Sequence, residues 1–157
     1  MNNVIKYFDY DEVLIVYSKM VEASDGGLSG VRYEDGILST LDTLQNDLRC
    51  PDFNTKLSYL VFKFCSGHYF TDGNKRISLT LGAYFLHKNG YHWQALVFMR
   101  QMESIVYHIA AGNIDESLLL RIINCFMINE EYDEELKLSL AHAMQGNKLG
   151  VEGEDYD

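Results

Sequence analysis

Residues 54–87 read NTKLSYLVFKFCSGHYFTDGNKRISLTLGAYFLH, which is two apolar stretches separated by a short polar loop. In the first stretch the apolar residues recur at helical spacing, and they predict a helix from about Asn54 to Ser66. The second stretch, from about Lys75 to His87, is apolar on nearly every side. A helix of that kind is usually the buried centre of its domain. We therefore expect the fold to be organised around this second helix.

The rest of the chain predicts further helices on both sides of this pair. Apolar spacing, capping aspartates and Gly or Pro stops place them at about Asp9 or Asp11 to Ala23, Gly36–Leu48, Gln94–Ala111, Asn113 or Asp115 to Ile128, and Glu131–Gln145, with Gly146 as the last stop. Neither an alternating strand pattern nor an internal repeat is present in the sequence. The prediction is an all-α protein, a compact bundle of about six to seven helices with a central buried helix.

Length and charge suggest one domain with an acidic extension. The 157 residues carry a net charge of −10, and residues 130–157 hold nine acids but two bases. We expect residues 1–129 to form the functional domain, 130–146 an acidic helix packed on it, and 147–157 a disordered acidic tail. Because no basic stripe is evident, direct nucleic-acid binding is disfavoured.

Location is suggested by what the sequence does not contain. No apolar run reaches the length of a membrane span, and the N-terminal residues lack the pattern of a secretory signal. The three cysteines, Cys50, Cys65 and Cys125, show no metal-ligand spacing. Buried free thiols in a reducing compartment are the simplest interpretation, so we expect a cytoplasmic protein.

The loop that precedes the central helix combines features of an anion site. Gly73 stands just before the helix start, where backbone N–H groups and the helix dipole favour a negative ligand. Lys75 and Arg76 add positive charge at the same end, which opposes the dipole by a few tenths of a kcal/mol unless an anion is bound. The arrangement therefore predicts a phosphate-binding site.

Two further residues of the loop suggest what is done with that phosphate. Asp72 beside a phosphate calls for a bridging cation, and Mg²⁺ is the natural one. His68, four residues earlier, is placed to take a proton from an incoming hydroxyl. Each residue has a plain structural interpretation when taken alone, as a helix-end hydrogen-bonder or a turn. Together they predict phosphoryl or nucleotidyl transfer, while Phe70 is a core anchor in either case.

The run from His68 to Arg76 resembles the motif of the Fic/Doc family, His-x-Phe-x-Asp/Glu-Gly/Ala-Asn-Gly/Lys-Arg, and matches all of its specified positions. The similarity is closest to the Doc (death-on-curing) toxins. The loop Gly26-Gly27-Leu28-Ser29-Gly30 looks like their Gly-Gly-Leu-Pro-Gly loop, and the resemblance covers about residues 10–127. It implies the compact helical Fic fold for a catalytic domain within residues 1–129.

The resemblance also implies a role for each motif residue. His68 would be the general base for a Ser, Thr or Tyr hydroxyl of a target protein, and Asp72 would hold Mg²⁺. Gly73, Asn74 and Lys75 would form an anion hole for ATP, with Asn74 also using its side chain. Arg76 would contact phosphate and Phe70 would seat the loop. Residues Gly26, Gly27, Leu28, Ser29 and Gly30 would belong to the flap that positions the target.

Two positions separate the subclasses of this family. Members that transfer AMP usually have glycine at position 75 and a second arginine at position 79, whereas this chain has Lys75 and Leu79. Doc-like toxins share both features and resemble kinases, with elongation factor Tu as target and a protein antitoxin as partner. We therefore favour phosphorylation by a toxin-type enzyme. AMP transfer and a catalytically silent binding module remain the alternatives.

Two features leave questions for the structure. Ser66 stands where the related toxin has a basic residue, which would weaken phosphate binding if that residue contributes to it. The acidic helix over 130–146 is either a solvated helix with acids in its first turn or a regulatory surface that masks the basic site or docks a partner.

Overall fold

The computed structural model describes residues 4–24 and 30–150, and over these residues the chain is all-α, as the sequence predicted. The extended pairing found in this part is a single antiparallel bridge between Val31 and Phe70. The helices are α1 (Tyr10–Ala23), α2 (Glu34–Leu44), α3 (Phe53–Ser66), α4 (Asn74–Lys88), α5 (His92–Ala110), α6 (Glu116–Met127) and α7 (Glu134–Gly150).

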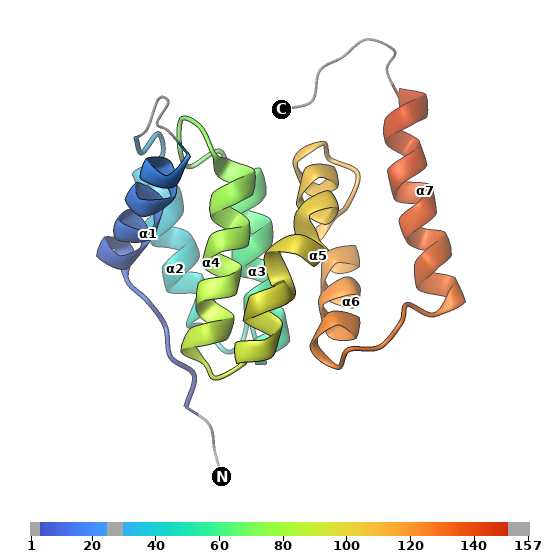
Figure 1. Ribbon diagram of the computed structural model, residues 1–157, viewed down its shortest axis with the longest axis horizontal. Coiled ribbons are helices and arrows are strands. Elements are labelled where there is room, and N and C mark those ends of the chain that lie inside the picture. The colour runs from blue at the N-terminus through green and yellow to red at the C-terminus, as the bar shows by residue number, and fades with distance from the viewer. Residues whose placement is uncertain (1–3, 25–29, 151–157) are drawn as a thin grey trace.

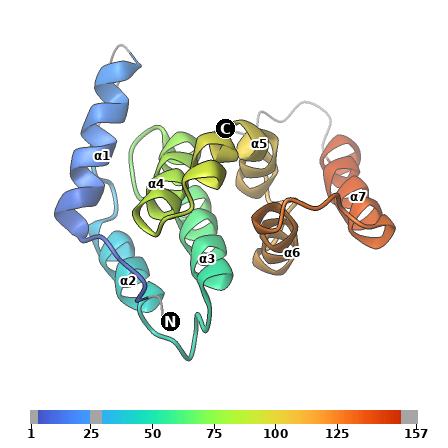
Figure 2. The same ribbon diagram turned by 60° about the horizontal axis from the view of Figure 1, so that its bottom comes forward.

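Helix α4 is the centre of the bundle, as its apolar composition predicted. It packs along α3 and α5 and also touches α1 (Figure 1 and Figure 2). Gly82 permits this close approach, because a Cβ atom at that position would lie 2.5 Å from the ring of Phe98 and 3.0 Å from a methyl group of Val61. The core of the protein therefore lies on both sides of α4, with the ends of that helix fixed by its neighbours.

Aspartates begin four of the helices. The side chains of Asp9, Asp52, Asp115 and Asp133 each accept the backbone N–H three residues further on, at 2.8–2.9 Å. A cap of this kind stabilises a helix by about 1 kcal/mol, because it satisfies an N–H group that has no partner within the helix. The predicted starts of α1 and α6 are thereby confirmed, and α7 begins three residues later than predicted.

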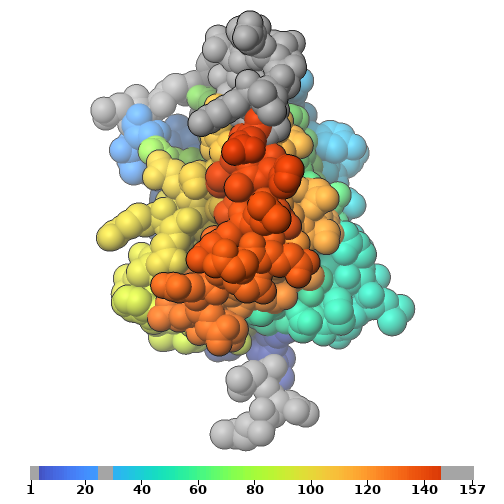
Figure 3. All heavy atoms as spheres, turned by 90° about the vertical axis from the view of Figure 1, so that its right-hand side faces the viewer, coloured from blue at the N-terminus to red at the C-terminus, as the bar shows by residue number. Residues whose placement is uncertain are grey.

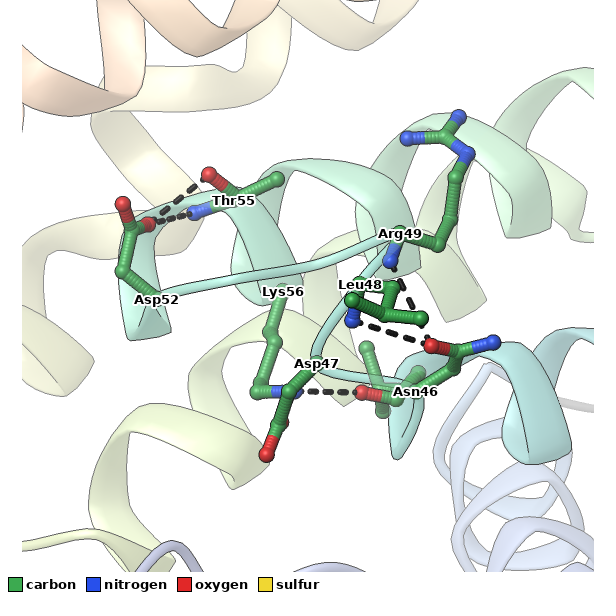
Figure 4. A network of polar contacts seen from close by, with 8 residues as sticks. Asn46, Asp47, Leu48, Arg49, Asp52, Thr55 and Lys56 are labelled. Atoms are coloured by element: carbon green, nitrogen blue, oxygen red, sulfur yellow. Dashed lines mark hydrogen bonds and ion pairs between the residues drawn. The ribbon is translucent and has the colours of Figure 1, made fainter.

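The end of α2 differs from the prediction, which carried that helix on to Leu48. Helix α2 ends at Leu44, and Leu48 is 96% exposed rather than part of an apolar face. The cause is Asn46, whose Oδ1 accepts the backbone N–H groups of Leu48 at 2.9 Å and Arg49 at 3.4 Å (Figure 4). Asn side chains often replace helical hydrogen bonds in this way, and apolar spacing alone does not reveal it.

A buried lysine secures the turn that follows. The side chain of Lys56 in α3 is 1% exposed, and its Nζ donates to the carbonyl oxygen of Leu44 at 2.9 Å and to Asp47 at 2.8 Å (Figure 4). The ammonium group thus satisfies a carbonyl at the end of α2 and pairs with a carboxylate. It ties α2 to α3 on the side of the bundle away from the motif.

Helix α7 covers the outside of α5 and α6, where it forms the outermost layer (Figure 3). Leu136 is its buried anchor, and Tyr132, Leu140, Ala143 and Met144 are half-buried against the core. The helix runs to Gly150 and so passes Gly146, where the sequence predicted its end. Residues 151–157 of the predicted tail lie outside the described residues. None of the helices described has the length and apolarity needed to cross a membrane.

The loop between α3 and α4 lies at the same end of the bundle as the start of α2 and the C-terminal end of α5 (Figure 1). Arg32, just before α2, and Ala110, at the end of α5, line a hollow together with residues of the motif loop. All three cysteines are free thiols, with Cys50 and Cys65 buried and Cys125 half-buried, and the thiol of Cys65 in α3 donates to the carbonyl of Val106 in α5 at 3.2 Å.

Candidate active site

His68 is presented to solvent by the way α3 ends. Gly67 closes that helix, and His68 then adopts a left-handed backbone conformation, with φ of 53°. The side chain of His68 is exposed, whereas Tyr69 and Phe70 after it are buried. Non-glycine residues rarely adopt this conformation, and they do so most often at functional sites. The loop thus directs one polar ring outward between a helix end and two buried aromatic side chains.

The two aromatic residues hold the loop in the core. Phe70 is fully buried and stacks on Tyr17 of α1, with 4.0 Å between the ring centroids. The hydroxyl of Tyr69 lies 2.6 Å from that of Thr40 in α2. Gly67 and Gly36 flank the Tyr69 ring so closely that a Cβ atom at either position would overlap it. The position of His68 is therefore fixed by contacts that its two neighbours make with α1 and α2.

The middle of the loop is braced by two side chains. The hydroxyl of Tyr17 donates to the carbonyl oxygen of Asp72 at 2.8 Å. Asn74 spans the loop: its Oδ1 accepts the N–H of Phe70 at 3.1 Å, and its Nδ2 donates to the carbonyl of Phe70 at 3.0 Å. The side-chain amide of Asn74 is thus engaged in closing the loop. Tyr17 was not singled out by the sequence, because it looks like any apolar-face residue of α1.

Helix α4 starts directly after this brace. Gly73 is its N-cap residue, with a left-handed φ of 79°, and its N–H donates to Asp72 Oδ1 at 2.8 Å. No side chain caps this helix start. The first N–H groups of a helix have no partners within the helix, and the dipole adds positive potential there. Lys75 and Arg76 begin the same turn, so positive charge gathers at this point.

A hollow of about 600 Å³ opens in front of this helix start. Six of the predicted site residues line it together with the anchor Phe70, namely His68, Asp72, Gly73, Asn74, Lys75 and Arg76. Arg32, which the sequence did not single out, also lines it. The hollow therefore combines three cations, one carboxylate and one imidazole, a set suited to binding an anion and moving a proton beside it.

Residues 30–33, which include Arg32, are paired with the motif loop. The N–H groups of Arg32 and Tyr33 both donate to the carbonyl of Tyr69, at 2.8 and 3.0 Å, and the N–H of Thr71 donates to the carbonyl of Gly30 at 3.1 Å. This short pairing fixes the segment against the motif loop. Of the predicted flap residues, Gly30 belongs to the pairing, while Gly26, Gly27, Leu28 and Ser29 lie outside the described residues.

A second hollow of about 450 Å³ adjoins the first on the α5 side and shares Lys75 and Arg76 with it. Its remaining lining is mainly apolar and comes from α4 and α5: Leu79, Met99, Arg100, Glu103, Val106 and Tyr107. The side chains from α5 could not be assigned to the site from sequence, because only the packing of α5 on α4 brings them to Lys75.

Potential metal ligands and three of the other histidines lie apart from one another or away from the site. Within the described ranges no cluster of three or more His, Cys, Asp or Glu side chains could hold a metal ion without help from a ligand. His87 and His92 lie outside the lining of the two hollows, with their Nδ1 atoms 2.9 Å apart, and His108 contacts Asn113. His68 is thus the imidazole of the site.

Comparison with known proteins gives one positive result. The sequence model of the Fic/DOC family matches residues 7–86, a range that extends from just before α1 almost to the end of α4. It therefore includes the motif loop and residues 30–33 opposite it. No curated protein and no solved structure matches the chain significantly.

Proposed function

Because this chain belongs to the Fic/DOC family, we propose that it is a transferase that uses ATP to modify a hydroxyl side chain of another protein. The observation that carries the proposal is the meeting of His68, Asp72 and Arg76 around one hollow at the start of α4. A base, a carboxylate and an anion-binding helix end are the parts that such a transfer needs. We further propose that the group transferred is the γ-phosphoryl group.

In this proposal each motif residue has one task. The imidazole of His68 accepts the proton of the target hydroxyl as its oxygen attacks phosphorus. The bond between the γ-phosphorus and the β–γ bridging oxygen breaks, and ADP leaves with that electron pair. The backbone N–H groups of Asn74 and Lys75 stabilise the phosphate oxygens, while that of Gly73 orients the Asp72 carboxylate at 2.8 Å, and Arg76 neutralises the phosphate charge. Phe70 and the amide of Asn74 keep the loop in place while this happens.

A magnesium ion fits this site as a companion of the nucleotide. Asp72 is exposed on the rim of the hollow, and it is the carboxylate among the lining residues described. Mg²⁺ is commonly held by one or two carboxylates, with phosphate oxygens and water completing its shell. When bound, the ion would offset the negative charge of the polyphosphate. Asp72 would hold it from the loop that Tyr17 and Asn74 brace.

The second hollow favours γ-phosphoryl over AMP transfer. Leu79 and Tyr107 offer an apolar wall and a ring face, which suit a purine base, and the hollow adjoins Lys75 and Arg76. A nucleotide with its base there extends its phosphates across these two cations toward the start of α4. The terminal phosphate, which is farthest from the base, is then the one presented to His68.

Labelled ATP distinguishes the two reactions. The purified chain is incubated with Mg²⁺, a candidate target and ATP labelled at either the γ- or the α-phosphate. We expect the γ-label on the target and no α-label, and we expect no labelling by His68→Ala. Transfer of the α-label alone would establish AMP transfer. Labelling that persists in His68→Ala would remove His68 from the mechanism, and binding of ATP without any transfer would favour a silent module.

The proposed position of the purine base of ATP in the second hollow can be tested separately. Tyr107→Ala should weaken binding of ATP several-fold and leave binding of inorganic tripolyphosphate unchanged. Leu96→Ala is the matched control, because Leu96 is 80% exposed on the same helix and does not line the hollow. Equal ATP affinity in both variants would place the base elsewhere.

The biological setting is proposed on the family relationship. We propose a toxin-type role in the cytoplasm, with elongation factor Tu as the first target to test and a protein antitoxin as partner. Expression of the wild-type chain should arrest bacterial growth, and expression of His68→Ala at the same level should not. If both are equally harmful, the toxicity comes from binding rather than catalysis.

A further inference from the structure

Arg32 differs from the other cations of the anion hollow, because it comes from the segment before α2 and not from the motif. Its backbone N–H donates to the carbonyl of Tyr69, the residue next to His68, at 2.8 Å. Its Cα is therefore fixed beside the motif loop even though its side chain is exposed. Arg32 is one of the residues that line the hollow.

The charge balance of the hollow calls for a ligand of opposite sign. Arg32, Lys75 and Arg76 line it with Asp72 as the carboxylate. Several cations outside the hollow are paired, as Arg49 is with Glu116 at 2.6 Å and Lys88 with Glu12 at 2.9 Å. Among the described residues, no carboxylate pairs with Arg32 in this way. Like charges gathered in one hollow repel one another, and a polyphosphate relieves that repulsion.

Ser66, two residues before His68, gives a second reason to expect that Arg32 binds the anion. The hydroxyl of Ser66 donates to the carbonyl of Phe62, one helical turn back, at 2.7 Å. It is thus directed into its own helix, and Ser66 does not line the hollow. The α3 side of the site therefore contributes no positive charge from this position, and Arg32 is the cation that lines the hollow from outside the motif.

From these observations we propose that Arg32 binds the polyphosphate of the nucleotide together with the start of α4, as a third cation beside Lys75 and Arg76. The proposal rests on the proposed transferase function. A planar guanidinium can make two parallel hydrogen bonds to one phosphate, which an ammonium group cannot do. Arg32 is then a substrate-binding residue that the motif itself does not contain.

Binding of inorganic tripolyphosphate in the presence of Mg²⁺, measured by calorimetry, tests this without any need for turnover. Arg32→Gln should raise the Kd at least about tenfold, since hydrogen bonds to charged groups are worth about 1.5–3 kcal/mol. Arg32→Lys should restore only part of the affinity. Arg121→Gln is the matched control, because Arg121 lies in α6 outside the hollow and is 40% exposed. It should bind like the wild type.

The outcomes separate this proposal from the proposed function. If Arg32→Gln binds within twofold of the wild type, or the wild type does not bind tripolyphosphate, the role given to Arg32 is wrong. A raised KM for the protein target with unchanged tripolyphosphate binding also overturns it and assigns Arg32 to target recognition. If Arg32→Gln loses affinity but the wild type labels no target, the binding role stands and the transferase assignment fails.

Discussion

Replacement of Asn74 by alanine removes the two hydrogen bonds that close the motif loop onto Phe70, at 3.1 and 3.0 Å. Each bond contributes about 1 kcal/mol to stability, so the loss is about 2 kcal/mol. For a chain of this size the melting temperature should fall by about 4–8 °C, since 1 kcal/mol corresponds to about 2–4 °C. The protein stays folded, but the loop that carries Asp72 loses one of its two side-chain braces and keeps that from Tyr17.

The effect on the reaction should be much larger than the effect on stability. A displacement of about 1 Å in a positioned group can cost about a hundredfold in rate. We therefore expect Asn74→Ala to reduce label transfer by about this factor at temperatures where it is fully folded. Rates and thermal unfolding are measured on the same preparations.

Asn89 provides the matched control. It braces a backbone segment in the same manner, since its Oδ1 accepts the N–H of Lys6 at 2.8 Å and its Nδ2 donates to the carbonyls of Lys6 and Phe85 at 3.0 and 2.9 Å. It lies at the opposite end of α4 from the motif. Asn89→Ala should lose comparable stability and keep its activity. If the two variants lose activity equally, or if Asn74→Ala keeps full activity, the loop brace has no catalytic role.

Three further predictions concern other side chains. Tyr17→Phe keeps the ring stack but loses the 2.8 Å hydrogen bond to the carbonyl of Asp72, so the Mg²⁺ concentration for half-maximal activity should rise several-fold. Tyr91→Phe, outside the lining of the hollow, should leave that concentration unchanged, and an unaltered Mg²⁺ dependence in Tyr17→Phe would refute the prediction. Burial raises the pKa of Cys65 to about 11, so iodoacetamide at pH 8 should alkylate Cys65 only after denaturation. Half-buried Cys125 should already be alkylated in the native protein, and mass spectrometry that finds Cys65 alkylated there would contradict the prediction. Hydrogen bonds from the Tyr84 hydroxyl and from Lys88 lower the pKa of Glu12, so its stabilising contribution should be present above pH 4.5 and lost as the pH falls through the lowered folded-state pKa. The free energy of unfolding of Glu12→Gln in urea should therefore differ from that of the wild type at pH 7 and approach it at acid pH, and a difference that does not change with pH would contradict this.

Local sequence was sufficient for the helices and for the motif. Apolar spacing and capping aspartates act within one or two turns, so α1, α3, α4 and α6 could be placed to within a residue or two. The end of α2 was missed because Asn46 redirects two N–H groups, an effect of one side chain on its own backbone that apolar spacing does not record. The extension of α7 through Gly146 was missed because a glycine only disfavours a helix and does not forbid it.

The sequence by itself determined that His68, Asp72, Gly73, Lys75 and Arg76 lie together, because nine consecutive residues at a helix start cannot separate. Only the tertiary structure decided what faces them. Arg32 reaches the hollow through backbone pairing with Tyr69, Tyr17 reaches the loop from α1, and the apolar wall at Leu79 is completed from α5. These contacts join residues far apart in the chain, and they arise from the packing of α1 and α5 on α4 and of α2 on α3, which no local pattern specifies.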